Sequence, residues 1–519
     1  MLNNNLLEGP LYTDFYQLTM AQLYYEQQMH ETPARFEHFF RSYPDYGEHQ
    51  AGYCIQAGTN WFLNWLEDLE FSSESLEKLR RHKNSSGEKI FSDEFLNWLS
   101  SQNIADRLTV EAIPEGRVVH PTVPLTVVEG PLALAQLVET ALLNQLNYQV
   151  LIATRAARVS QAGRGNLLLE FGLRRAHDRG GHAGARAALI GGADFSSNTG
   201  LSYHYNQPPK GTHAHSMIQA YIARGKTELE AFRDFASLYP DSCVLLVDTI
   251  DTLQSGLPNA IKVFDELKKQ GHQPLGIRLD SGDLAHLAVR SARILNDAGH
   301  EDVNIVLSNQ LDEQVLRQII EQIEEEAPEY NLESENIIDR LVYGVGTRLI
   351  TSAGDSSLGG VYKLVALEKE GSPQPVLKIS ENLEKIPTPG HKKIWRIYDG
   401  RGRATADLIG QPGEEIQTDE TVEICHPFRQ HASRRLQREE ISEIELLHEP
   451  FLKSGERLRH FNLEEARQRR REDLARLDPG VKRIMNPHYY HVSLTRKMRQ
   501  EKQELINSIG MSSKQEEGF

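Results

Sequence analysis

The chain has 519 residues, of which 39% are hydrophobic and 25% charged, and its formal net charge is −16 at pH 7. This composition is typical of a globular protein with a buried core, and the length suffices for about two to four domains. The acidic excess argues against nucleic acid or an anionic membrane as a partner, because both attract basic surfaces.

The three cysteines, Cys54, Cys243 and Cys425, lie far apart and form no CxxC pair. They therefore indicate neither a disulfide framework nor a zinc knuckle, and they fit a reducing compartment. The first residues, MLNNNLLEGPLYTDFYQ, lack the basic start and apolar core of a signal peptide. Since no apolar run approaches the roughly 18 residues of a membrane span, we expect a cytoplasmic protein.

Residues 1–140 are expected to form an N-terminal α+β domain. The segment TDFYQLTMAQLYYEQQ has helical spacing, and ARFEHFFRSY is typical of a strand. The segment PEGRVVHPTVPLTVVEGP predicts short strands joined by turns. From Leu132 to about Gly163, apolar residues recur at three and four positions, which predicts one long helix or a pair.

Residues 141–350 contain short apolar runs, most of them followed by a helical pattern. The runs are NLLLEFG (166–172), AALIGGAD (187–194), CVLLVDTID (243–251), PLGIRLDSGD (274–283), VNIVLSNQLD (303–312) and RLVYGVGTR (340–348). This alternation predicts βαβ units around a parallel sheet, either open or closed into a barrel. The runs end at Glu170, Asp194, Asp248, Asp280, Ser308–Asn309 and Gly346–Thr347. Because functional groups gather at the C-terminal ends of barrel strands, we favour an irregular α/β barrel of the TIM type.

Residues 351–519 are expected to form a C-terminal β-hairpin and charged helical region. GVYKLVALEKEGSPQPVLKIS and KKIWRIYDGRGRATADLIG are typical of hairpin strands around Gly/Pro turns. From about residue 451 the pattern is helical, and its mixed-sign charge predicts a solvated face. This region also contains three lysines that are suited to contact ATP or phosphates, although the sequence assigns them to no specific site: Lys363, Lys378 and Lys385.

Two aspartates end apolar strands, Asp248 in LVDTID and Asp280 in GIRLDSGD. A Ser-Gly turn such as Ser281–Gly282 exposes backbone N–H groups that can receive a phosphate, and an adjacent Asp suits Mg²⁺ or ribose hydroxyls. The alternative is that each Asp caps the next helix. A further strand end whose glycines allow the backbone to approach an anion holds Gly344, Gly346 and Thr347. Neither GxGxxG after a strand nor a Walker loop occurs.

The segment LEFGLRRAHDRGG adds an aromatic ring and two cations. Phe171 at a strand end suits stacking on a planar ring, and the guanidinium of Arg174 or Arg175 matches phosphate or carboxylate geometry. Arg278, two residues before Asp280, points to the same face of its strand. The alternative is that these arginines pair with surface carboxylates.

The segment GTHAHS places His213 and His215 two residues apart. In an extended segment they share a face, as a metal pair requires. Metal-dependent barrel hydrolases use such a pair together with histidines on later strands, and the later strand ends here hold none. The residues alone leave open a metal pair, a structural role, and catalysis or phosphoryl carriage by one histidine.

Taken together, the motifs resemble those of the nicotinate phosphoribosyltransferases over most of the chain. In the family's order they are LYTDFYQLTMAQLYY, ARFEHFFR, VVEGPLALAQLVETALLNQLNYQVLIATRAARV, LLEFGLRRAH, GGADFSSNTGLS, GTHAHSMI, LLVDTIDTL, GIRLDSGDL and YGVGTRLITS. The resemblance implies an ATP-coupled transfer of phosphoribosyl from phosphoribosyl pyrophosphate to nicotinate, giving nicotinate mononucleotide and pyrophosphate in NAD salvage. It also implies an incomplete α/β barrel backed by an N-terminal domain, Mg²⁺, small-molecule substrates, and a homodimer whose active sites form between subunits.

The resemblance assigns roles by motif. The histidine of GTxAH falls on His215, the expected phosphohistidine, while His213 occupies the variable position and is expected to be incidental. Asp248 and Asp280 are expected to hold the ribose and Mg²⁺-pyrophosphate, with Asp280 as the Mg²⁺ ligand. The nicotinate-binding residues are Tyr16 (from the neighbouring subunit), Phe171, Thr212, Arg278 and Ser197. The phosphate-binding residues are Arg174, Gly346 and Thr347, joined by Ser281, Gly282 and Gly344 from the turns described above.

Ser197 bears on the choice of base. It aligns with a position where nicotinamide-using relatives carry an acid, and a neutral residue suits a carboxylate substrate because Asp would repel it. The rival hypotheses are a nicotinamide-preferring phosphoribosyltransferase, a metal-dependent barrel hydrolase using His213 and His215, and a non-catalytic nucleotide sensor.

Overall fold

The computed structural model describes residues 4–47, 49–378, 386–417, 421–429 and 432–516. The chain divides into two units, one formed by Met1–Leu151 with Ser357–Phe519 and the other by Ile152–Ser356. The segment expected as 1–140 and most of the segment expected as 351–519 therefore fall in the first unit, and most of 141–350 falls in the second. Within the described residues, no helix has the length and apolar character needed to span a membrane.

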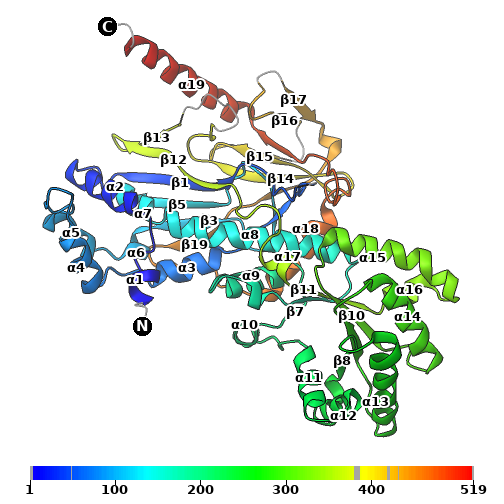
Figure 1. Ribbon diagram of the computed structural model, residues 1–519. Helices are drawn as coiled ribbons and strands as arrows, with labels where there is room; N and C mark the ends of the chain where they lie inside the picture. Colours follow the sequence, from blue (N-terminus) through cyan, green and yellow to red (C-terminus); the bar gives the residue numbers. More distant parts are fainter. Residues whose placement is uncertain (1–3, 48, 379–385, 418–420, 430–431, 517–519) are drawn as a thin grey trace. The chain divides into compact units, whose positions relative to one another are not determined.

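The first unit is built on two large sheets (Figure 1). One has the strand order β13-β12-β1-β5-β3-β19-β20 and the other β17-β16-β21-β15-β14-β18. The strands of the first are β1 (Pro33–Phe40), β3 (Thr109–Ala112), β5 (Thr126–Pro131), β12 (Gly360–Lys369), β13 (Ser372–Pro375), β19 (Glu449–Lys453) and β20 (Glu456–Arg457). Those of the second are β14 (Lys393–Asp399), β15 (Ala404–Gly410), β16 (Val422–Cys425), β17 (Ser433–Leu436), β18 (Ile441–Leu446) and β21 (His491–Leu494). A short pair, β2 (Cys54–Ile55) and β4 (Val118–Val119), forms a third sheet.

Helices pack on these sheets around an apolar core that includes Phe36, Phe62, Phe95 and Leu134. The helices of this unit are α1 (Asn4–Glu8), α2 (Phe15–Glu26), α3 (Thr59–Glu67), α4 (Ser73–Arg81), α5 (Asp93–Ser100), α6 (Ile104–Arg107), α7 (Leu132–Leu137), α18 (Leu463–Arg476) and α19 (Arg496–Glu516). α7 packs against β1 and β5, and α2 packs against α7. The pair predicted after Leu132 is confirmed as α7 and α8 (Glu139–Ala162), and α8 continues into the second unit.

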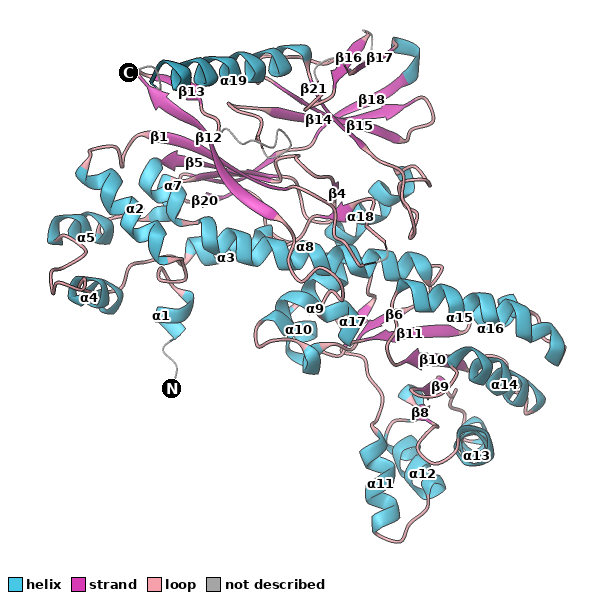
Figure 2. Cartoon of the chain, turned by 45° about the horizontal axis from the view of Figure 1, so that its top comes forward, coloured by secondary structure: helices cyan, strands magenta, loops and turns pink. Residues whose placement is uncertain are grey.

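The second unit contains one sheet with the order β7-β6-β11-β10-β9-β8, and all of its neighbouring strands are parallel. Its strands are β6 (Leu168–Glu170), β7 (Phe195–Ser196), β8 (Val244–Leu246), β9 (Gly276–Leu279), β10 (Asn304–Ser308) and β11 (Leu341–Val345). Its helices are α9 (Gly180–Gly191), α10 (Thr199–His204), α11 (His215–Ala223), α12 (Glu228–Leu238), α13 (Leu257–Lys269), α14 (Leu284–Asp297), α15 (Glu313–Glu326), α16 (Ser334–Ile338) and α17 (Thr347–Ile350). Figure 2 shows helices and strands alternating along this part, as the sequence predicts.

One predicted strand is wrong. The run AALIGGAD lies mostly in helix α9, and the strand that follows it is the short β7. Gly191 shows why small residues are needed there, since a Cβ on it would lie 2.1 Å from the carbonyl oxygen of Ala153 in α8. Asp194 does not end a strand; its carboxylate accepts the Leu168 N–H at 2.8 Å.

The C-terminal region is less helical than predicted. It contains α18 and α19 but also β19, β20 and β21. Ser454 and Gly455, between β19 and β20, both have positive φ (50° and 77°), as a tight two-residue hairpin turn requires. This turn redirects a stretch whose apolar spacing alone is compatible with a helix.

A buried ionic network ties α18 to the six-stranded sheet of the first unit and to the residue before β4. Asp473 of α18 accepts hydrogen bonds from Arg117 Nε at 2.9 Å and from Arg396 Nη1 at 3.1 Å. Arg396 also pairs with Asp407 at 2.8 and 2.9 Å, and Arg117 pairs with Glu445 at 2.7 Å through both Nη atoms. Arg396, Asp407 and Asp473 are buried. Because buried charges are costly unless paired, the network fixes α18 against Arg117, 356 positions earlier, and Arg396, 77 positions earlier.

We predict that Asp473→Asn lowers the free energy of unfolding of the first unit by about 3–5 kcal/mol, because it leaves Arg117 and Arg396 short of a counter-charge. All four tryptophans lie in this unit, so urea unfolding followed by tryptophan fluorescence reports on it. Glu423→Gln, which removes the partner of exposed Arg496, is the control and should cost at most about 1 kcal/mol. Equal costs for the two variants would contradict the prediction.

Candidate functional site

The candidate site centres on Arg278, in β9. Its Nε donates to Ser308 Oγ at 2.8 Å, Nη1 to Thr212 Oγ1 at 3.0 Å and Nη2 to Asp280 Oδ1 at 2.9 Å. Ser308 Oγ in turn donates to Asp280 Oδ1 at 2.5 Å. The guanidinium is 12% exposed, so these groups hold a nearly buried cation at a fixed position. The carboxylate that Arg278 pairs with is Asp280, at the end of its own strand.

Phe171, directly after β6, faces the same cation. Arg278 Cζ lies 5.6 Å from the centre of the Phe171 ring, which is buried. Gly344 in β11 makes room for the ring, since a Cβ there would lie 2.6 and 2.7 Å from two ring carbons. An aromatic face beside a guanidinium suits a flat, negatively charged ligand.

Glu170, the last residue of β6, holds this strand end in place through its carboxylate. Its fully buried carboxylate accepts Ser196 Oγ–H at 2.6 Å and the backbone N–H of Gly172, and burial raises its pKa. The Glu170 carbonyl accepts the N–H of Ser197 at 2.9 Å. Ser197, half-buried, is thereby held at the end of β7, beside the strand that carries Phe171.

Asp248, two residues after β8, contacts Asp280 and lies close to His215. Its Oδ2 accepts the N–H of Asp280 at 2.9 Å and Ser281 Oγ–H at 2.6 Å. Its Oδ1 is buried without a hydrogen bond and lies 3.6 Å from Nε2 of His215, the first residue of α11. A buried carboxylate oxygen without a donor is costly, so Oδ1 is suited to receive a proton-bearing group from His215.

The helix-capping alternative for the two aspartates is also wrong. The cap of α14 is Asp283, whose Oδ1 accepts the N–H groups of Ala285 and His286, both at 3.1 Å. The turn after β8 is capped by Asp251 in the same way. Each strand end therefore carries a D-x-x-D pattern in which the second Asp caps and the first, Asp248 or Asp280, faces the site.

His213 is buried, and its Nε2 accepts the backbone N–H of Leu246 at 3.1 Å. Burial lowers its pKa to about 4. A metal at this nitrogen would have to displace the hydrogen bond, and within the described ranges no group of three or more His, Cys, Asp or Glu side chains is arranged to hold a metal. The metal-pair hypothesis for GTHAHS therefore has no support.

The remaining predicted residues border this set or lie elsewhere. Arg174 and Arg175 are exposed in a 3₁₀ turn, Leu173–Arg175, after β6. Gly346 and Thr347 form the turn after β11, and Gly282 has φ +77° in the turn after β9. The first unit contains Tyr16, 48% exposed, together with half-buried Lys363 and exposed Lys378, whereas Lys385 lies outside the described residues.

Sequence reasoning placed Ser308 among the strand-end groups without a specific partner, treated His213 as a metal-pair candidate or as incidental, and gave Ser196 no role. Ser308 is visible in the sequence only as the last residue of a strand run. Ser196 donates to the Glu170 carboxylate on the neighbouring strand, and His213 accepts a backbone N–H of β8, and periodicity identifies neither contact.

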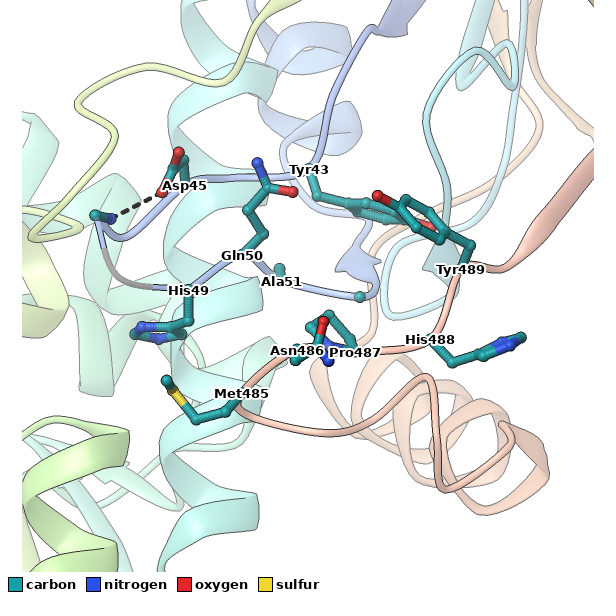
Figure 3. A pocket seen from close by; sticks show the side chains of 12 residues that line it. Tyr43, Asp45, His49, Gln50, Ala51, Met485, Asn486, Pro487, His488 and Tyr489 are labelled. Carbon is teal, nitrogen blue, oxygen red and sulfur yellow. Dashed lines mark hydrogen bonds between the residues drawn. The ribbon is translucent and has the colours of Figure 1, made fainter.

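A separate cavity of about 310 Å³ lies in the first unit between residues 43–52 and 485–489 (Figure 3). Its lining includes Tyr43, Asp45, His49, Met485 and Tyr489. None of the predicted site residues lines it. Among its described lining residues there is no Lys or Arg to hold a phosphate, so it is not part of the candidate site.

Comparison with protein families and known proteins gives one consistent result. Residues 11–147 match the model of the nicotinate phosphoribosyltransferase N-terminal domain, and residues 391–502 match that of its C-terminal domain. The chain is 36% identical over 503 residues to nicotinate phosphoribosyltransferase of Bacillus subtilis (strain 168), covering 96% of this chain and 95% of that protein. It is 30% identical over 553 residues to the Homo sapiens protein of the same name, covering 96% of each.

The fold agrees with this result. The crystal structure of human nicotinic acid phosphoribosyltransferase superposes with a TM-score of 0.77 at 27% identity, covering 95% of this chain and 99% of that one. A nicotinate-nucleotide pyrophosphorylase from Pyrococcus furiosus shares the fold, with a TM-score of 0.65 at 20% identity over 92% of this chain and 97% of that one.

We predict that Gly344→Ala lowers the free energy of unfolding by about 1–3 kcal/mol, because its Cβ overlaps the Phe171 ring. Differential scanning calorimetry measures this in the whole chain. Phe171→Leu in the same chain should recover part of the loss, since the two side chains are in contact. The control is Gly200→Ala, where a Cβ meets nothing within 4 Å. A Gly344→Ala chain as stable as this control would show that the ring is not confined.

Proposed function

The chain belongs to the nicotinate phosphoribosyltransferase family, and we propose that it couples its reaction to ATP through His215. The enzyme transfers phosphoribosyl from phosphoribosyl pyrophosphate to nicotinate and forms nicotinate mononucleotide in NAD salvage. The observation that carries the proposal is the continuous set of contacts from Phe171 and Arg278 through Asp280 and Asp248 to His215.

Arg278 and Phe171 are the proposed nicotinate site. A guanidinium has five N–H donors, and Arg278 uses three, one on each nitrogen, for Ser308, Thr212 and Asp280. One donor therefore remains on each terminal nitrogen, which is the spacing that a carboxylate accepts in a two-point contact. Phe171 offers its face to the ring, and neutral Ser197 adds no repulsion. This set favours nicotinate over nicotinamide.

Asp248 and Asp280 are proposed to face the ribose and the leaving pyrophosphate. Breaking the bond at C1 of the ribose builds positive charge on the sugar, and a fixed carboxylate nearby stabilises it. Asp280 Oδ1 is engaged by Arg278 and Ser308, and its side chain is 34% exposed, so the carboxylate can also meet a hard cation. Mg²⁺ bound there would neutralise the pyrophosphate, and the Ser281–Gly282 turn, Arg174, Gly346 and Thr347 would bind phosphate oxygens.

His215 is the proposed phosphoryl acceptor. Asp248 Oδ1 lies 3.6 Å from Nε2, so a closer approach of the two would place the ring proton on Nε2 and leave the lone pair of Nδ1 free to react. Attack of Nδ1 on the γ-phosphorus forms the N–P bond and breaks the bond to the ADP oxygen, and water later returns phosphate and the free imidazole. The N-terminal end of α11, where His215 lies, favours the added negative charge.

The same proposal includes the shape of the sheet, the cellular compartment and the oligomeric state. The six-stranded sheet of the second unit is an incomplete barrel of the TIM type, with the strand ends described above at its mouth. The protein acts as a cytoplasmic homodimer in which the partner subunit's Tyr16 stacks on nicotinate opposite Phe171. The homodimer is supported by three exposed side chains on α2: Phe15, Tyr16 and Leu23 are 48%, 48% and 55% exposed.

Purified chain should form the mononucleotide from nicotinate, phosphoribosyl pyrophosphate and Mg²⁺, with little product from nicotinamide. ATP should raise the yield and appear as ADP. His215→Ala should lose the ATP effect and the ADP while keeping the ATP-independent reaction, because the phosphoryl acceptor is gone but the base and ribose sites are intact. ADP formation unchanged in His215→Ala would refute the histidine's role, and no product from either base would refute the proposed site.

Ser197→Asp should raise the KM for nicotinate by about tenfold or more, because a carboxylate placed beside the bound carboxylate repels it. Ser197→Asn, similar in size but neutral, should stay within about threefold of the wild-type KM. Steady-state kinetics at fixed phosphoribosyl pyrophosphate measures both. If the Asp and Asn variants have the same KM, Ser197 does not face the substrate carboxylate.

A further inference from the structure

The unpaired edge of strand β8 poses a physical problem. β8 ends the sheet order of the second unit and pairs with β9 alone. The N–H of Val247 faces β9, where it donates to the Arg278 carbonyl at 3.2 Å, so the N–H of Leu246, one residue earlier, points to the open side. Leu246 is buried, and a buried N–H without an acceptor is strongly unfavourable.

His213 provides the acceptor. Its Nε2 receives the Leu246 N–H at 3.1 Å, so this nitrogen carries no proton and the ring proton lies on Nδ1, which faces the Ala214 carbonyl at 3.5 Å. The ring packs edge-on against Phe235 of α12, with centroids 5.1 Å apart, and lies 6.0 Å from Phe232. Burial lowers the pKa of His213 to about 4, aided by the positive charge of Arg278, so the ring is neutral at pH 7.

The other end of the same segment is held by β7, the opposite edge strand. The Lys210 N–H donates to the Ser196 carbonyl at 3.0 Å. Residues 210–213 therefore connect both edges of the sheet, and three residue steps span at most about 11 Å. Thr212, which contacts Arg278, lies inside this bridge, and His215 lies two residues beyond it.

We propose that His213 is a positioning residue that anchors the segment carrying Thr212 and His215 to the open edge of β8. Asp248 follows Leu246 by two residues, so the anchor and the carboxylate that faces His215 belong to one rigid strand end. The anchor thereby sets the separation between the His215 imidazole and Asp248. This inference rests on the proposed role of His215, and it replaces the expectation that His213 is incidental.

The test compares three variants of the full chain. His213→Phe keeps an aromatic ring but removes the acceptor, whereas His213→Gln keeps an acceptor oxygen. His300→Phe is the matched control, since His300 is also buried in this unit and packs edge-on against Phe264, 5.7 Å away, but contacts no residue of the site. The readouts are phosphate transferred from ATP to His215, and the KM and kcat of the reaction without ATP.

His213→Phe should slow phosphorylation of His215 by about tenfold to a hundredfold, as expected for a reacting group displaced by about 1 Å. The ATP-independent kcat should change less than this, because Ser308 and Asp280 still hold Arg278 when Thr212 moves. His213→Gln should remain within about threefold of wild type, and His300→Phe within about twofold. Equal defects in His213→Phe and His300→Phe, or in His213→Phe and His213→Gln, would overturn the proposal.

The hydrogen bond between His213 and the Leu246 N–H can also be tested in the wild-type chain without measuring activity. In protein labelled with ¹⁵N in its histidine rings, the signal that disappears in His213→Gln should show an unprotonated Nε2 and a protonated Nδ1 from pH 7 down to about pH 5.5. A protonated Nε2, or a ring that becomes charged in this range, would refute the hydrogen bond to Leu246. If wild-type His215 takes up no phosphate, the proposed function fails. The tautomer of His213 still shows whether His213 accepts the Leu246 N–H.

Discussion

The site depends on how one nearly buried cation, Arg278, is neutralised. Its guanidinium contacts a carboxylate, two hydroxyls and an aromatic ring that come from separate segments of the chain. Those segments meet because parallel strands end at the same edge of the sheet, so β6, β9 and β10 deliver Phe171, Asp280 and Ser308 to one place. A charged group with so little solvent fixes the positions of its partners, since each lost contact leaves charge uncompensated.

Much of the second unit is predictable from the sequence, because the pattern of buried parallel strands and amphipathic helices is local. The runs that contain β8, β9, β10 and β11 were all expected as strands, and they are strands. The run AALIGGAD shows the limit of the method. A short, wholly apolar segment buries equally well as a strand or as a helix, and the choice here is made by close packing of Gly191 against α8, which no periodicity reveals.

The reactive side chains at the strand ends are equally predictable from the sequence, but the contacts that connect them are not. Asp248 and Asp280 follow apolar strands in an obvious way, and the second Asp of each D-x-x-D pattern explains why the first is not needed as a cap. Ser308 and Ser196 matter because they bridge groups on different strands. His213 matters because β8 happens to be an edge strand. These facts depend on the order of strands in the sheet, which the sequence does not state.

The bridge at residues 210–213 also links the two chemical events that the proposed function requires. Thr212 holds Arg278 by a hydrogen bond at 3.0 Å, and His215 follows three residues later on the same segment. A phosphoryl group on His215 adds about −1.5 to −2 charge near the Asp248 carboxylate, which repels it. Under the proposed function, the anchor at His213 would keep the segment at β8, so a shift of phosphorylated His215 would act on Thr212. Thr212 contacts the guanidinium proposed to bind nicotinate, so the state of the histidine would have a physical route to the base site.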